Sequence, residues 1–252
     1  MPARVAFIIN EYFNEHNLQE EYNFSFPSQR AWGTSPFLME AYPTHLAPNY
    51  EKTMYFKRYI IEGEWLLNND TFLDTAYWVI RKWGGISSFK ENEENTTALQ
   101  NLQDTLIADN PNIHAIPFKK ISSISKVASL LKPDLCAIYD SRAIYSLNWL
   151  LFIHAPGLPL FCQPEGRNED MANLHQTTIF NLSHAGAIFL DKTRCYARYC
   201  EFLQRIAHEL HLLGRQNVSI TDIEMLLFTI ASTHIVADIH NRVTIAIDRP
   251  NS

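Results

Sequence analysis

Glycine is scarce in this chain, with only eight in 252 residues, whereas an all-β sandwich with many tight turns needs it repeatedly. No apolar run approaches the roughly 18 residues of a membrane-crossing helix. The first residues lack the small-residue cleavage site of a signal peptide. With 46% hydrophobic residues, the composition indicates a packed, mostly helical protein. We expect it to be soluble, cytoplasmic and bacterial in type, without membrane association.

Cysteine is also rare, and the four present form no CxxC pair: Cys136, Cys162, Cys195 and Cys200. This distribution predicts reduced thiols rather than a disulfide framework or a zinc ribbon. The sequence contains no phosphate loop, no GxGxxG and no GxSxG motif. NTPase, Rossmann and α/β-hydrolase functions therefore lose their main support, and we expect no cofactor.

The histidines form no familiar metal motif. His208 and His211 are one residue too close for the zincin spacing. His234, Asp238 and His240 could approach one another near the end of the last helix, but histidines near helix ends are common without a metal. The sequence therefore predicts no metal site.

Acidic residues exceed basic ones, 27 to 21, giving a net charge of −6. This balance disfavours a nucleic-acid binder that relies on overall positive charge. The two signs are nevertheless segregated along the chain. Residues 1–50 carry five acidic and two basic residues. Residues 91–110 carry five acidic residues and no basic ones. Residues 111–160 carry five basic residues and only two acidic ones, so the middle of the chain is locally cationic.

The hydrophobic periodicity predicts one all-α domain. We expect a helical core over residues 49–236, an N-terminal elaboration over 1–48 and a C-terminal tail or short strand over 237–252. The strand is suggested by the alternation of Val243, Ile245 and Ile247.

Three helices have clear signals. One begins at a cap on Asp70 and ends at Gly84-Gly85. A second covers 96–108, preceded by an acidic loop, and a third covers 191–213. A capping box over 221–224 opens a last, buried helix.

The segment 118–151 places two ionisable groups of opposite sign around an apolar connection. Lys126 lies in a short amphipathic helix that breaks at Pro133, and Asp140 opens the next helix after an extended stretch. A lysine in an apolar setting can act as a nucleophile. The alternative is that Lys126 is a surface lysine and Asp140 an ordinary helix cap.

This arrangement resembles the active-site region of helix-hairpin-helix DNA glycosylases, and most closely bacterial proteins with an 8-oxoguanine DNA glycosylase fold. The resemblance rests on Ser125-Lys126-Val127 followed by Pro133 through Arg142. Weaker matches are Trp83-Gly84-Gly85-Ile86, Gly166-Arg167-Asn168, the helix 196–203 and the stretch 223–228. Ser122-Ser123-Ile124-Ser125 stands where the family has a glycine-containing hairpin.

The resemblance implies a DNA glycosylase-like helical fold and possible lyase activity. Lys126 would attack C1′ of a damaged nucleotide to form a Schiff base, and Asp140 would stabilise positive charge on the sugar. The implied DNA-contacting residues are Lys119, Lys120, Ser123, Ser125, Arg142, Arg167 and Asn168. The implied base pocket consists of Tyr139, Tyr145 and Trp149.

Two alternatives remain open at this point. The chain could be a catalytically silent member of the same fold, in which Lys126 and Asp140 form a salt bridge and the protein binds nucleic acid or a protein. It could instead be an interaction module whose acidic segments are the working surface. An open cleft containing both residues favours the enzyme, and a filled cleft favours the silent protein.

Overall fold

The structure, a computed structural model, describes residues 2–36, 42–43, 46, 49–164, 175–183 and 186–244. The α-helices in these residues are α1 (Pro2–Glu15), α2 (Leu18–Glu21), α3 (Gln29–Trp32), α4 (Asn49–Glu62), α5 (Asn69–Trp78), α6 (Glu93–Ile107), α7 (Ile121–Leu131), α8 (Ser141–His154), α10 (Gln176–Leu182), α11 (Lys192–Leu212), α12 (Ile220–Ile230) and α13 (Val236–Arg242). A 3₁₀ turn, η2 (Ile113–Ala115), and two π-helical turns, η1 (Val79–Trp83) and η3 (Ala231–Ile235), complete them. Within the described ranges the only β-type pairing is an isolated bridge between Leu160 and Phe189. The predicted all-α class is confirmed.

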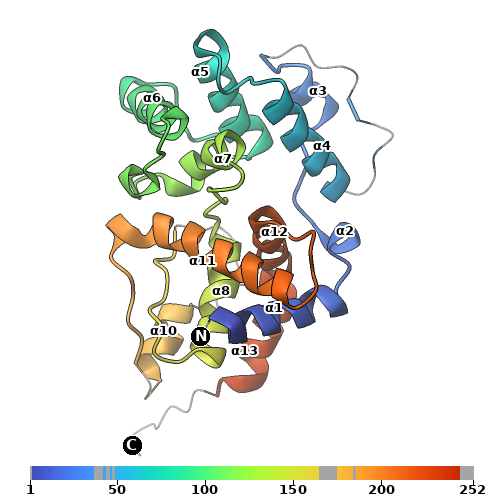
Figure 1. Ribbon diagram of the computed structural model, residues 1–252, viewed down its shortest axis with the longest axis vertical. Coiled ribbons are helices and arrows are strands. Elements are labelled where there is room, and N and C mark those ends of the chain that lie inside the picture. The colour runs from blue at the N-terminus through green and yellow to red at the C-terminus, as the bar shows by residue number, and fades with distance from the viewer. Residues whose placement is uncertain are drawn as a thin grey trace, which may run out of the picture.

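The helices form two groups, with α7 on the side of one group that faces α11 of the other (Figure 1). One group contains α3 to α7, and the other contains α1, α8 and α10 to α13. Within the second group α12 packs against α8 and α11, and α1 packs along α11. Contacts of α2 with α4, and of α11 with η2, join the groups. Residues that bridge the two groups can therefore form a site between them.

The N-terminal helix belongs to the body of the protein. Val5, Ala6 and Ile9 of α1 are fully buried, so the first 15 residues are part of the packed core and not only an elaboration of it. At the other end, helical structure continues to Arg242, beyond the predicted boundary at 236. Ile245 and Ile247 of the expected strand lie outside the described residues.

The predicted helix boundaries need small corrections. Asn68, not Asp70, caps α5, because its side chain accepts a hydrogen bond from the Asp70 N–H. Some of the acidic residues expected in a loop before residue 96 are helical, because α6 begins at Glu93, directly after its cap Asn92. The helix over 191–213 is confirmed as α11, with Asp191 as its cap.

The capping box of α12 lies two residues earlier than predicted. Ser219 and Asp222 form it reciprocally, which leaves Glu224 inside the helix, buried with only 4% of its surface exposed. The continuous helical stretch Ile220–Arg242 is long and apolar enough to cross a bilayer by length and composition alone. Within its most apolar window, 67% of the residues are buried inside the protein, as in the core helix of a globular fold.

Candidate functional site

A cleft of about 860 Å³ lies between the two helix groups and contains both predicted catalytic residues. Its walls come from the loop after η1, the start of α7, the start of α8 and the start of α11. They include Gly84, Phe89, Phe118, Ser123, Lys126, Asp140, Gln163 and Lys192. The cleft is open, so the segment 118–151 does not merely fill a core.

Lys126 projects into this cleft from α7 and is only 5% exposed. Its ammonium Nζ donates a hydrogen bond of 3.2 Å to the carbonyl oxygen of Ser122, one turn earlier on the helix. Its aliphatic chain passes over Gly84, where an added β-carbon would lie 2.5 Å from the lysine Cδ. Lys126 is therefore a buried lysine whose position is fixed by a hydrogen bond and by packing against Gly84. It is not the surface lysine of the alternative interpretation.

Asp140 caps α8, as expected, because one carboxylate oxygen accepts a 2.8 Å hydrogen bond from the Arg142 N–H. The same residue lines the cleft. Among the described residues Asp140 makes no ion pair with Lys126, whose ammonium is bonded to Ser122. The salt bridge expected for a catalytically silent protein is therefore not formed.

Ser125, which the resemblance placed in contact with DNA, does not line the cleft but joins the two segments that carry Lys126 and Asp140. It is fully buried, and its Oγ accepts a 2.9 Å hydrogen bond from the backbone N–H of Tyr139. Ser125 precedes Lys126 and Tyr139 precedes Asp140. This bond therefore fixes the extended chain at 137–140 against α7.

The turn that precedes the lysine helix lies earlier than the serine run suggested. Ser122 to Ser125 already belong to α7, and the turn residue is Lys120, with φ +60° and ψ +25°. That left-handed conformation is one that glycine adopts most easily. Lys120 and Ser123 both line the cleft, so the start of α7 opens onto it.

Two further lysines on the cleft were not singled out from the sequence. Lys90 follows η1, and Lys192 begins α11; both are exposed cleft residues. In the part of the chain that the structure describes, neither makes an ion pair. The described lining residues thus include four lysines, among them Lys120 and Lys126, and one acidic residue, Asp140. This described part of the cleft is cationic in a chain of net charge −6.

The predicted DNA-contacting cations that the structure describes have partners within the protein. Lys119 and Lys120 both pair with Glu94, at 2.6 and 3.2 Å. Arg142 donates to the Asn23 side chain and stacks over the Phe228 ring at 4.5 Å. Lys119 and Arg142 are not among the cleft-lining residues. Arg167 and Asn168 lie outside the described residues.

The predicted base pocket is wrong, because Tyr139, Tyr145 and Trp149 are buried core residues. Each is at most 3% exposed, and none lines the cleft. The Tyr139 hydroxyl donates to the Cys162 carbonyl oxygen at 2.7 Å, and the Trp149 Nε1 donates to Asp238 at 2.8 Å. The aromatic rings that do line the cleft are those of Phe89 and Phe118.

Two buried charges lie behind the site. Lys57 on α4 and Glu224 on α12 are 6% and 4% exposed. The pKa of the Glu224 carboxyl is raised to about 7, chiefly by burial and in part by Asp140, while Lys57 and Lys126 oppose the rise. Burial likewise lowers the pKa of Lys57, against the pull of Glu224. Protonation of this pair is thus electrostatically linked to the cleft residues.

Comparison with known proteins identified no matching family model, curated protein or solved structure.

Proposed function

We propose that this protein acts on DNA as a helix-hairpin-helix glycosylase-like enzyme, with Lys126 as the nucleophile. The observation that carries the proposal is the cleft itself, in which a buried lysine and a helix-capping aspartate from consecutive helices open onto one cationic cavity. A cleft lined by a few convergent polar groups is typical of a binding or active site.

The chemistry follows from the two residue types. The Lys126 ammonium loses a proton to solvent, and Nζ attacks C1′ of an extruded nucleotide. The glycosidic bond breaks, and the base leaves with its electron pair and takes up a proton. The bond from C1′ to the ring oxygen O4′ then breaks, O4′ takes up a proton released from Nζ, and an iminium is left between Nζ and C1′. Loss of a C2′ proton then expels the 3′ phosphate and cuts the strand. The Asp140 carboxylate stabilises the positive charge that develops on the sugar.

Three features of the cleft support nucleic acid as the substrate. Lys90 and Lys192 provide exposed positive charge for phosphates, which is the main source of affinity for DNA. The start of α7 adds the N–H groups and positive end of a helix, a common phosphate contact. The half-buried Phe118 on the cleft wall provides ring surface for an unstacked base.

Borohydride trapping tests this proposal. The full chain is incubated with duplex and single-stranded oligonucleotides bearing 8-oxoguanine, uracil or an abasic site, and borohydride reduces any iminium to a stable amine. We expect a covalent adduct with wild type and none with Lys126→Gln. Lys82→Gln is the matched control, because it removes an exposed amine outside the cleft and should keep the adduct.

The outcomes are distinct. No adduct from wild type on any substrate, with salt-sensitive DNA binding retained, would leave a DNA-binding protein without lyase chemistry. An adduct that persists in Lys126→Gln would place the nucleophile elsewhere. Absence of both adduct and binding would exclude DNA as the substrate.

A further inference from the structure

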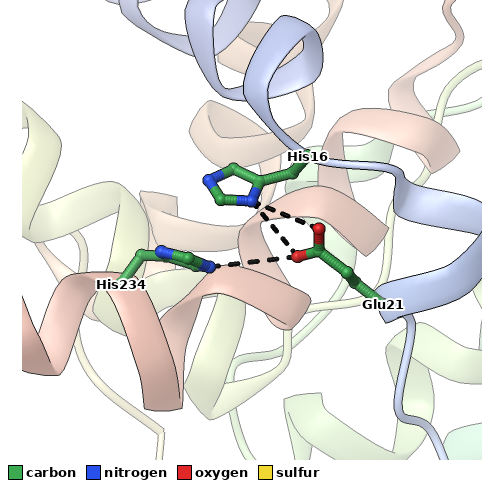
Figure 2. A group of neighbouring side chains, drawn as sticks. All are labelled: His16, Glu21 and His234. Atoms are coloured by element: carbon green, nitrogen blue, oxygen red, sulfur yellow. Dashed lines mark hydrogen bonds and ion pairs between the residues drawn. The ribbon is translucent and has the colours of Figure 1, made fainter.

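Three potential metal ligands from distant parts of the chain converge away from the cleft. His16 lies in the link between α1 and α2, Glu21 ends α2, and His234 lies on the π-helical turn η3 (Figure 2). Both imidazole rings direct a nitrogen toward the Glu21 carboxylate. None of the three lines the cleft.

The spacing of the donor atoms suits a metal ion. Nδ1 of His16 lies 3.2 Å from Oε2 of Glu21, and Nε2 of His234 lies 3.9 Å from the same oxygen. One donor atom from each residue falls within 4.8 Å of the others. Ligands bound at about 2.0–2.1 Å around a tetrahedral ion are themselves roughly 3.3 Å apart, so small side-chain movements would complete the site.

A bound metal ion also accounts for the close approach of the His16 and His234 imidazole rings. Their ring centroids are only 3.9 Å apart, a separation at which two imidazolium cations would repel each other. A shared metal ion accepts the lone pairs of two neutral rings. The carboxylate of Glu21 then offsets part of the charge of the ion.

The surroundings hold the ligands in place. The Tyr12 ring stacks on His16 at 5.8 Å and meets His234 edge-on at 6.5 Å. His234 is carried by a π-helical turn between α12 and α13, and such turns inside longer helices are often found at functional sites. Asp238, which the sequence suggested as a partner of His234, is instead bonded to Trp149 and Arg242.

We propose that His16, Glu21 and His234 bind one divalent transition-metal ion of the Zn²⁺ class. Two imidazole nitrogens and one carboxylate favour such an ion over Mg²⁺ or Ca²⁺, which prefer oxygen ligands. Three protein ligands leave one tetrahedral position for water. The ion links α1 and α2 to the helical stretch Ile220–Arg242.

Titration of the metal-free full chain with Zn²⁺ in a calorimeter tests the proposal, because it requires no DNA activity. We expect one equivalent to bind, with affinity lowered roughly tenfold or more in His234→Asn and in Glu21→Gln. The matched controls are His240→Asn and Glu20→Gln, exposed neighbours of the same residue types, and they should bind as wild type does. Circular dichroism establishes that each variant is folded.

Visible absorption of bound Co²⁺ provides a second measurement. Wild type should show the intense bands of a tetrahedral site, and both ligand variants should lose them. Absence of saturable Zn²⁺ binding in wild type would overturn the proposal. Equal binding by the two ligand variants and the two controls would also overturn it.

Discussion

The buried Oγ of Ser125 accepts a 2.9 Å hydrogen bond from the backbone N–H of Tyr139. These two residues are the immediate chain neighbours of Lys126 and Asp140. One hydrogen bond thus sets the distance between the helix that carries the candidate nucleophile and the residue that caps the next helix.

Replacing Ser125 with Ala should therefore affect both stability and the proposed chemistry. The change leaves the Tyr139 N–H without its partner in a buried position, at a cost of about 1–3 kcal/mol in the free energy of unfolding. Urea unfolding measures this loss, and trapping yield should fall because Asp140 is less well held. Ser183→Ala, whose hydroxyl bonds one turn back in α10, is the control and should leave trapping unchanged. A Ser125→Ala protein with full stability would contradict the prediction.

Asp140 has two roles that substitution can separate. Asn caps a helix about as well as Asp does, so Asp140→Asn should retain stability, whereas Asp140→Ala should lose about 1 kcal/mol. Both variants lack the carboxylate charge, and both should lose trapping activity. Thermal unfolding and trapping are measured on the same samples. Full activity in Asp140→Asn would reduce the residue to a structural cap.

Gly84 is required by the path of Lys126. A β-carbon at position 84 would lie 2.5 Å from the lysine Cδ and 2.8 Å from the Ile80 carbonyl oxygen. Gly84→Ala should therefore displace the lysine and cost about 1–3 kcal/mol through overpacking. Gly33→Ala is the matched control, because the nearest atom would be 3.6 Å away. Trapping that is unimpaired in Gly84→Ala would show that the position of the lysine is not critical.

The sequence predicted the local structure of the segment 118–151 well because its signals are local. The α7 periodicity, the break at Pro133 and the cap at Asp140 all lie within a short stretch, and each is set by neighbouring residues. The same reasoning failed for Tyr139, Tyr145 and Trp149, since aromatic residues near a site can point either into the cleft or into the core. Here the Tyr139 hydroxyl and the Trp149 indole find partners inside the fold.

Long-range features could not be predicted from the pattern. The approach of His16 and Glu21 to His234 depends on how α1 and α2 pack, and nothing in the sequence near any of the three indicates it. The capping box was placed at 221–224 because that stretch also fits the motif. Glu224 is instead drawn inside by the packing of α12, which only the tertiary structure reveals.

The exposed lysines of the cleft should govern the salt dependence of DNA binding. Each lysine that contacts a phosphate contributes roughly one unit to the slope of log affinity against log salt. Lys90→Gln and Lys192→Gln should each reduce that slope by about one, as measured by fluorescence anisotropy. Lys82→Gln is the control, because Lys82 is exposed but outside the cleft. Equal slopes for all three variants and wild type would exclude the cleft as the binding surface.

Glu224 should make the stability of the protein depend on pH. Its pKa is raised by burial from 4.5 to about 7 in the folded chain, so the folded form binds more protons than the unfolded form between these values. The free energy of unfolding should therefore fall as pH rises from about 4.5 to about 7, by at most roughly 3 kcal/mol. The side chain of Glu224→Gln cannot titrate, so this variant should lose the part of the pH dependence of the free energy of unfolding that Glu224 contributes. Glu62→Gln, at an exposed position of α4, should keep the wild-type slope. Urea unfolding across this range tests the prediction, and parallel curves for wild type and Glu224→Gln would contradict it.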